Sequence, residues 1–401
     1  MFTIYQLSDL HFGKALISTE HNIKKEFRSH DERIWVILKT HLLNRIKNNQ
    51  DRYMVVITGD LSQLGHIDSY NLAKSLIYKN VNSDISKEYG LQLEEEHLFI
   101  VPGNHDSYDR SYVKKNNLRT FNNIFFPSIE SGDIYPTLKN IEVNGNNYIF
   151  MGIDSTYKKS FAAPRKKFGK GSVPKTQLAQ LTGRLKEIGD NNVRILCLHH
   201  CPIIVDGKRD RSLMLDRSQD LLSWITKNNI DILMCGHLHE DFYDILPLRK
   251  LISFLPSKRG FLRKKMKSYK ETQLNEYQPI SIKGKKARYI DSIAYHYIKA
   301  KYGGLLDPDK NEFGSIANFN DYLHNRPEYK EFVIDFSEFD KRETGILMAG
   351  TACQEKSRNN SYLEVNIDDD NDHITILRHK YNKTKKEFTT KERVLKFKYN
   401  V

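Results

Sequence analysis

Short apolar runs alternate with longer amphipathic stretches along the first two-thirds of the chain, a pattern typical of strands and helices packed in layers. The apolar runs predict strands at Phe2–Leu7, Tyr53–Thr58, His97–Val101, Val193–Leu198 and Ile230–Cys235. Apolar residues at helical spacing predict helices over Asp31–Asn48, Tyr108–Phe125, Pro174–Ile188 and Asp216–Lys227. Two β-rich runs, Ile134–Val143 and Tyr148–Ile153, flank Asn144-Gly145-Asn146 and predict a hairpin. The expected fold is therefore α/β (α+β), a layered β-sandwich flanked by helices.

This alternation ends after Asp241 and returns only in the last part of the chain. There, strand-like runs occupy Gly345–Ala352, Tyr362–Ile367, His373–Leu377 and Arg393–Tyr399. We therefore expect three parts: a core over residues 1–245, an insertion or cap over 246–344, and a β-rich segment over 345–401. The last segment is expected to complete the sheets of the core.

Charge gives the middle part a character of its own. The 401 residues include 63 Lys and Arg against 50 Asp and Glu, a formal net charge of +13. Residues 249–301 hold 15 basic and 3 acidic side chains with aromatics between them, whereas residues 302–345 hold 5 basic and 10 acidic ones. Such a basic segment fits a surface that binds the phosphates and bases of nucleic acids, and fits equally a solvated lid or an oligomer contact. Its densest point supplies the candidate substrate contacts Arg263, Lys264, Lys265 and Lys267.

Several protein classes are disfavoured by the remaining composition. No apolar run approaches the roughly 18 residues that a membrane span requires, so we expect no integral membrane association. The first residues lack the basic start and apolar stretch of a secretory leader. Four cysteines are too few and too scattered for a disulfide scaffold. We therefore expect a cytoplasmic protein with a folded core; its oligomeric state does not follow from the sequence.

Metal-binding side chains follow directly after five of the predicted strands. They form the motifs Asp9-Leu10-His11, Gly59-Asp60, Gly103-Asn104-His105-Asp106, His199-His200 and Gly236-His237-Leu238-His239. The ends of the strands in an open α/β sheet are where such a fold places its active site. One such motif would be an ordinary turn, but five of them predict a shared site.

The types of ligand restrict the metal. Oxygen and imidazole donors without thiolate favour borderline divalent ions such as Mn, Fe, Co or Zn, and we favour Mn. Two such ions about 3.5–4 Å apart need a bridging carboxylate, and together they can hold both the attacking and the leaving oxygen of a phosphoryl displacement. The motifs therefore point to a dinuclear metal site acting on a phosphate ester.

The ordered motif set resembles that of the calcineurin-like metallophosphoesterase superfamily. The match covers roughly residues 1–245 and the closing strands after Gly345, and the flanks of Asp9 and Asp60 are similar to the cyclic-nucleotide phosphodiesterase branch and to the DNA-repair nuclease branch. The resemblance implies that Asp9, His11 and His239 hold one metal, that Asn104, His199 and His237 hold the other, and that Asp60 bridges them. His200 is the alternative to His199 as a ligand.

The resemblance also implies the chemistry. A hydroxide between the metals would attack phosphorus, while His105 would stand near the leaving oxygen as general acid or as a donor to the phosphoryl group. Asp106 would orient or support the His105 side chain. The expected function is a phosphodiesterase acting on a nucleotide or nucleic acid. The alternatives are a phosphomonoesterase or phosphoprotein phosphatase, and a nucleic-acid- or partner-binding module that uses the basic insertion.

Overall fold

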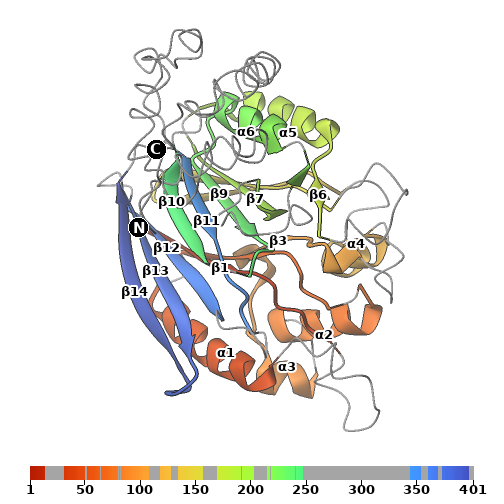
Figure 1. Ribbon diagram of the computed structural model, residues 1–401, viewed down its shortest axis with the longest axis vertical. Helices are drawn as coiled ribbons and strands as arrows, with labels where there is room; N and C mark the ends of the chain where they lie inside the picture. The colour runs from red at the N-terminus through yellow and green to blue at the C-terminus, as the bar shows by residue number, and fades with distance from the viewer. Residues whose placement is uncertain are drawn as a thin grey trace, which may run out of the picture.

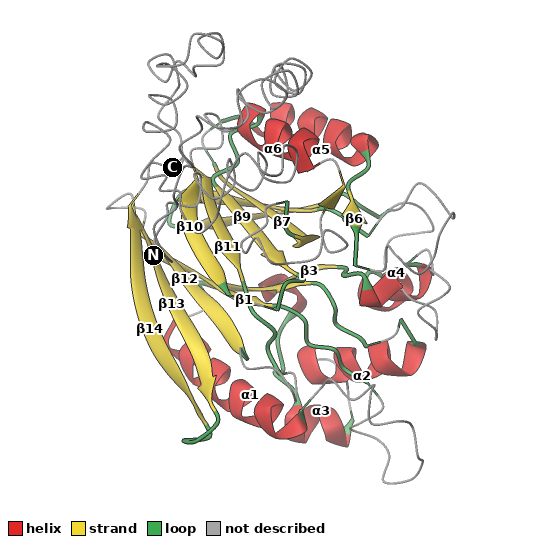
Figure 2. Cartoon of the chain, in the orientation of Figure 1, coloured by secondary structure: helices red, strands yellow, loops and turns green. Residues whose placement is uncertain are grey.

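The structure is a computed structural model, and two six-stranded sheets form its centre (Figures 1 and 2). It describes residues 1–13, 31–49, 52–107 without 64, 80 and 82, 118–127, 134–156, 169–202 without 191, 215–246 without 217 and 240, 344–353, 360–368 and 373–396. Figure 2 shows the two sheets between two sets of helices, with α5 and α6 on one side and α1, α2 and α3 on the other. This arrangement confirms the predicted layered α/β fold.

The first sheet combines strands from both ends of the chain. Its order is β14 (Glu387–Lys396), β13 (His373–Asn382), β12 (Ser361–Asp368), β1 (Phe2–Leu7), β2 (Tyr53–Thr58) and β3 (Leu98–Val101). β1, β2 and β3 run parallel, whereas β12 pairs antiparallel with β1. The carboxyl ends of β1, β2 and β3 therefore meet at one edge of the sheet.

The second sheet also combines parallel and antiparallel strands, and it includes a strand from late in the chain. Its order is β10 (Phe242–Leu246), β11 (Thr344–Met348), β9 (Ile232–Gly236), β7 (Val193–His200), β5 (Asn146–Gly152) and β4 (Thr137–Val143). β5, β7, β9 and β11 are parallel neighbours in the order β5, β7, β9, β11. A two-stranded pair, β6 (Gly171–Ser172) with β8 (Leu215–Asp216), lies apart from both sheets.

Helices cover the outer faces. They are α1 (Glu32–Ile46), α2 (Ile67–Ile77), α3 (Asp84–Tyr89), α4 (Arg119–Phe125), α5 (Lys175–Ile188) and α6 (Ser218–Lys227). In the described part of the chain, short 3₁₀ turns occupy Lys47–Asn49, Glu95–His97 and His105–Ser107. None of the described helices has the length and apolar character needed to cross a membrane.

Alternate residues of the central strands supply two separate cores. Phe2 and Ile4 of β1 pack between the two sheets, whereas Tyr5 and Leu7 pack against the helices α1, α2 and α4. This is the period of two expected for a strand that is buried on both faces. Because both faces of β1 are fixed by packing, its register and the place where it ends are fixed as well.

One predicted helix and two predicted strands differ from the observed elements. The helix predicted over Tyr108–Phe125 is described only as α4, because residues 108–117 lie outside the described part of the chain. The strands predicted at His373–Leu377 and Arg393–Tyr399 were too short and too far apart. The structure pairs His373–Asn382 with Glu387–Lys396 over ten residue pairs. The charged residues between the two predicted runs concealed this ladder, because an edge strand tolerates Lys and Glu on its solvent side.

A buried ionic cluster joins α1 to the C-terminal strands. The Arg45 guanidinium donates two hydrogen bonds to the Glu364 carboxylate, at 2.8 and 2.7 Å. Nε2 of His379 lies 3.0 Å from Oε2 of the same carboxylate. Burial alone would raise the pKa of Glu364, but His379 and Arg45 lower it to about 2. The carboxylate therefore stabilises the fold in its charged form.

We expect Glu364→Gln to lower the free energy of unfolding by about 2 kcal/mol at pH 7. The substitution leaves the buried His379 ring without its carboxylate partner, whereas Arg45 remains partly solvated and loses less. The pKa of Glu364 is lower in the folded state than its ordinary value of 4.5, so its contribution is complete above pH 4.5 and is lost as the pH falls towards 2. Urea denaturation of both proteins between pH 7 and pH 3 should show the difference shrinking on acidification. Glu94→Gln, which breaks the exposed pair with Lys79, is the control. A difference that grew at acid pH would contradict this role.

Candidate metal centre

Loops from both sheets converge at the carboxyl ends of their parallel strands. Asp9 and His11 follow β1, Asp60 follows β2 and Asn104 follows β3; His199 lies at the end of β7, and His237 and His239 follow β9. All of these side chains are buried except that of His239, which is 33% exposed. The site therefore lies at the seam between the two sheets and opens to solvent on the His239 side.

The backbone at this seam is held in an uncommon conformation. Asp9, His11, Asp60, His237 and His239 all have positive φ, between 51° and 74°. Residues with a Cβ pay about 1–2 kcal/mol in this region and persist there only when their surroundings fix them. Each of these five residues lies within four residues of the end of a buried strand. Strained backbone concentrated on polar side chains is typical of a functional site.

Two glycines allow the loops to approach one another closely. A Cβ on Gly103 would lie 2.1 Å from Oδ1 of Asp60, and a Cβ on Gly59 would lie 2.5 Å from Nδ1 of His199. No side chain fits at either position without movement of the site. Gly59 also has a φ of +91°, which favours glycine for a second reason. The glycines in the sequence motifs therefore act by leaving room for the ligand side chains.

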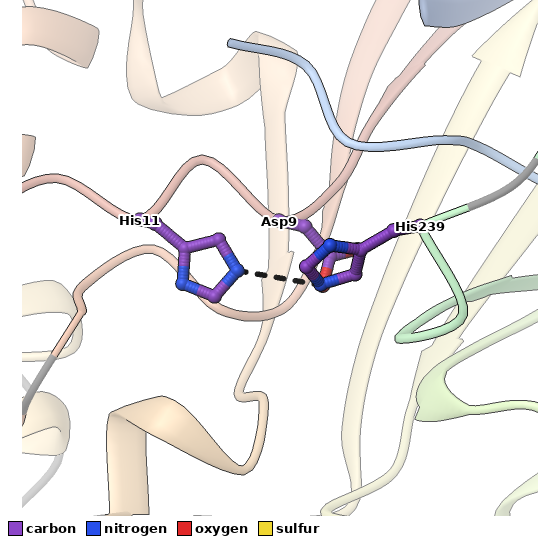
Figure 3. Close-up of side chains that lie close together, drawn as sticks. All are labelled: Asp9, His11 and His239. Atoms are coloured by element: carbon purple, nitrogen blue, oxygen red, sulfur yellow. Dashed lines mark ion pairs between the residues drawn. The ribbon is translucent and has the colours of Figure 1, made fainter. Parts of the chain in front are cut away.

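The first group of candidate ligands consists of Asp9, His11 and His239 (Figure 3). Oδ1 of Asp9 lies 3.1 Å from Nε2 of His239 and 3.8 Å from Nε2 of His11. The other oxygen, Oδ2, accepts hydrogen bonds from the Ser8 hydroxyl (2.6 Å) and from the His237 amide (3.1 Å). The carboxylate is thus oriented by one oxygen and presents the other to the two imidazoles.

The second group consists of Asp60, His199 and His237, with the Asn104 amide beside them. Nε2 of His199 lies 3.4 Å from Oδ2 of Asp60 and 3.0 Å from Oδ1 of Asn104. Nδ1 of His237 lies 3.2 Å from the same His199 nitrogen. Donors around a common ion at about 2.0–2.2 Å would be separated by comparable distances.

Asp60 connects the two groups. Its Oδ2 lies 3.4 Å from Nε2 of His199 and 3.8 Å from Nε2 of His11. Its Oδ1 accepts a hydrogen bond from the His105 amide at 2.8 Å. One oxygen therefore faces both groups of ligands while the other is held by the backbone, which is the arrangement that a bridging carboxylate requires.

Backbone carbonyls fix two of the imidazole rings. Nδ1 of His199 lies 2.7 Å from the Thr58 carbonyl, and Nδ1 of His105 lies 2.8 Å from the Gln63 carbonyl. A carbonyl only accepts, so in each of these two contacts Nδ1 is the nitrogen that carries the proton toward the carbonyl. This is the way in which metal-binding histidines are commonly oriented in proteins.

The buried carboxylates of the site favour a bound positive charge. Burial raises the pKa of Asp60, but His199 and His105 hold it well below its usual range. Burial likewise raises the pKa of Asp9, and His239 outweighs it in the opposite direction. Burial lowers the pKa of His199, but Asp60 and Asp9 raise it to about 9. Two buried carboxylates thus draw a proton onto a buried imidazole, and a divalent cation would supply that charge instead.

Unsatisfied nitrogens provide a direct test of whether the residues suit a metal. Both ring nitrogens of His11 and Nε2 of His237 are buried and have no hydrogen-bond partner within the described part of the chain. Burial lowers the pKa of both rings to about 3, so each is neutral at pH 7. Neutral imidazole is the form that binds metal ions, and buried nitrogens of this kind otherwise cost stability. The residues therefore fit divalent cations.

A family model described as calcineurin-like phosphoesterase matches residues 2–241. The chain belongs to the calcineurin-like phosphoesterase family. The match ends directly after His239, so it includes all five ligand motifs and leaves out the strands β10 to β14. The predicted family resemblance is thereby confirmed.

Two curated relatives share this family core at low identity. One is a probable cyclic nucleotide phosphodiesterase from Pseudoalteromonas sp. (strain SM9913), 25% identical over 47% of this chain and 56% of the relative. The other, from Vesicomyosocius okutanii subsp. Calyptogena okutanii (strain HA), bears the same name and is 24% identical over 60% of this chain and 79% of the relative. The chain thus spans little more than half the length of the first relative.

Two solved structures also show distant similarity to this chain. A Vps29 single mutant from Entamoeba histolytica is 9% identical, covers 98% of this chain and 99% of its own, and has a TM-score of 0.32. A phosphopantetheinyl hydrolase from Mycobacterium tuberculosis is 12% identical over 60% of this chain and 84% of its own, with a TM-score of 0.34. Similarity at this level adds no argument about the site.

The structure brings together all seven side chains that the phosphoesterase motifs predict as ligands. His199 lies within the second group of candidate ligands, as predicted for it in preference to His200. His200 lies beside the cluster, with Nδ1 2.9 Å from the Ser155 hydroxyl and its ring 4.5 Å from that of His237. The four candidate substrate contacts Arg263, Lys264, Lys265 and Lys267 lie outside the described residues.

Asp106 has different partners from those expected. Its carboxylate accepts hydrogen bonds from the amides of Leu61 (3.2 Å), Ser62 (2.9 Å) and Gly103 (2.9 Å), and from the Ser62 hydroxyl (3.1 Å). These bonds join the loop after β2 to the loop after β3. Asp106 thus supports the backbone that carries Asp60 and Asn104, whereas the His105 ring is oriented by the Gln63 carbonyl.

Proposed function

We propose that this phosphoesterase is a dinuclear metal-dependent phosphodiesterase that hydrolyses a nucleotide or nucleic-acid phosphodiester. The observation that carries the proposal is the position of Asp60 Oδ2 between two groups of imidazoles and carboxylate oxygens. Asp9, His11 and His239 would hold one divalent ion, and Asn104, His199 and His237 the other. Oxygen and imidazole donors without thiolate suit Mn, Fe, Zn or Co, of which we favour Mn.

The chain's own residues then prepare the site for a phosphate ester. When bound, two divalent ions neutralise phosphoryl charge and lower the pKa of the attacking water. Ser8 and the His237 amide hold the Asp9 carboxylate in one orientation, and the His105 amide does the same for Asp60. Because the two carboxylates are already held in place, they do not have to be reoriented during the reaction.

His105 is the proposed contact to the reacting phosphate. Its ring packs edge-on against that of His11 with the centroids 4.7 Å apart, and its Nδ1 proton is engaged by Gln63. Nε2 is therefore the atom that can face the phosphoryl group or the leaving oxygen. Its ring is only partly buried, which fits a residue that meets substrate.

We expect His105→Ala to keep both metal ions and to lower kcat by about 10²–10⁴-fold, the range for loss of a positioned acid or donor. Metal content by mass spectrometry and turnover of bis-p-nitrophenyl phosphate with Mn²⁺ check this. His97→Ala is a matched control, because Nδ1 of His97 also meets a backbone carbonyl, that of Tyr53, at the opposite end of the sheet. A His105 variant that loses its metal would show that His105 is a ligand instead.

The substrate class is supported by two observations outside the metal site. Both curated relatives carry the name probable cyclic nucleotide phosphodiesterase. The basic segment at residues 249–301 would suit a phosphate-rich ligand. Neither the dinuclear site nor its loops separates diesters from monoesters, because the metals contact the phosphoryl group in both cases.

The function is tested by comparing substrates on the same metal-loaded protein. Bis-p-nitrophenyl phosphate should be hydrolysed faster than p-nitrophenyl phosphate, and cyclic nucleotides and single-stranded nucleic acids should be assayed next. Faster monoester hydrolysis would indicate a phosphomonoesterase or phosphoprotein phosphatase. If the chain bound no metal and hydrolysed none of these, yet bound nucleic acid with steep salt dependence, it would be a binding module.

A further inference from the structure

A short segment after β11 runs beside the loop that carries Asp9 and His11, here called the ligand loop. This return segment, Thr351–Cys353, gives one hydrogen bond to each of three consecutive carbonyls. The bonds run from the Ala352 amide to Ser8 (3.0 Å), from the Thr351 hydroxyl to Asp9 (2.9 Å) and from the Cys353 thiol to Leu10 (3.4 Å). In Figure 3 the C-terminal segment, in blue, passes beside Asp9. Residues about 340 positions apart in sequence thus form one unit.

The ligand loop needs such support because its backbone is strained. Asp9 and His11 have φ values of 53° and 51°. Their amides are held from the other side, since they donate to the Gly59 and Asp60 carbonyls at 3.1 and 2.8 Å. The loop after β2 therefore fixes the amides of the ligand loop, and the return segment fixes its carbonyls. Left-handed residues persist when their neighbours determine them in this way.

The return segment is itself firmly anchored. Thr351, Ala352 and Cys353 are fully buried. The Thr351 carbonyl accepts a hydrogen bond from the Ser361 amide at 2.9 Å, and the Cys353 carbonyl accepts one from the Asp31 amide at 2.7 Å. Asp31 is the N-cap of α1. The segment thus connects the ligand loop to β12 and to a helix, both of which are packed in the core.

We infer that Thr351 is a positioning residue for the Asp9 carboxylate. Oδ2 of Asp9 is held by Ser8 and by the His237 amide, so the backbone at Asp9 decides where Oδ1 lies. The Thr351 hydroxyl bonds the carbonyl of that same residue. The inference rests on the proposed function for its consequence, the affinity for metal. Thr351 lies outside residues 2–241, the part that matches the family model.

The test is Mn²⁺ binding to the full chain by isothermal titration calorimetry. Thr351→Ala should weaken binding about tenfold to hundredfold, the range for loss of a group that orients a metal ligand, and Thr351→Ser should restore most of it. Thr344→Ala is the matched control. Its hydroxyl is also buried and donates to a backbone carbonyl, that of Ile230 at 2.8 Å, but it does not touch the ligand loop.

Equal Mn²⁺ affinity in Thr351→Ala and Thr344→Ala would overturn the inference, as would a Thr351→Ser protein as weak as the alanine variant. If the unmodified protein bound no Mn²⁺, the proposed function would fail, and hydrogen exchange of the metal-free protein would decide about Thr351. Faster exchange of peptides covering residues 8–13 in Thr351→Ala, but not in Thr344→Ala, supports positioning. Unchanged exchange there refutes it.

Discussion

Asp60→Asn is expected to abolish turnover, with kcat falling by about 10³-fold or more, a barrier increase of about 4 kcal/mol. Asparagine keeps the size of the side chain and removes its charge. Because Oδ2 of Asp60 faces both groups of imidazoles, the charge that would sit between two cations is lost along with one donor. We expect at least one of the two metal ions to be lost as well.

The measurements are metal content after gel filtration and turnover of bis-p-nitrophenyl phosphate. Asp231→Asn is the control, because Asp231 is also buried but precedes β9 at the end of the sheet opposite the site, where it accepts from the Arg194 amide at 2.8 Å. That variant should keep its metals even if it is less stable. An Asp60→Asn protein that retained two ions and more than about a tenth of its activity would refute the bridging role.

Gly103→Ala should damage the same site by steric means alone. The added Cβ would lie 2.1 Å from Oδ1 and 2.3 Å from the amide nitrogen of Asp60, distances at which the two loops must separate. Overpacking of this kind typically costs about 1–3 kcal/mol of stability. A displacement of about 1 Å at a catalytic group can cost about 10²-fold in rate. We expect both effects, together with weaker metal binding.

Gly183→Ala provides the contrast. Gly183 lies within α5, and a Cβ there would meet nothing within 4 Å. Alanine is favoured over glycine in a helix by about 1 kcal/mol, so this variant should be slightly more stable and fully active. Urea denaturation and turnover of both variants test the pair. Activity of Gly103→Ala within a few-fold of that of the unmodified protein would show that the loops are less closely packed than the structure indicates.

That these side chains lie together could be predicted, because their placement depends on local sequence. Each of the motifs begins at the end of an apolar strand, and parallel strands bring their carboxyl ends to one edge. A run such as Val193–His200 therefore identifies both the strand and the residues at its end. The contact between the His199 ring and the Thr58 carbonyl could not be predicted, because that carbonyl belongs to a different strand.

Interactions between distant segments left no signal in the sequence. The family resemblance implies that Asp106 supports His105, but the Asp106 carboxylate contacts the loop after β2. Thr351 lies in an unremarkable Gly-Thr-Ala run, and nothing there indicates a hydrogen bond to Asp9. The β13–β14 ladder was missed for another reason, since its charges hide the alternation that identifies a strand.

The late strands also have a consequence for how the molecule is made. β11 lies between β9 and β10, and β12 joins β13 and β14 to β1, so the second sheet stays incomplete until β11 has left the ribosome, and the first sheet until β12, β13 and β14 have. At about 5–20 residues per second, the Asp9 loop would wait on the order of 20–70 seconds for Thr351. The ligand loop is thus among the first parts synthesised and among the last to be closed. A nascent chain halted before residue 344 would lack the support of its earliest ligands.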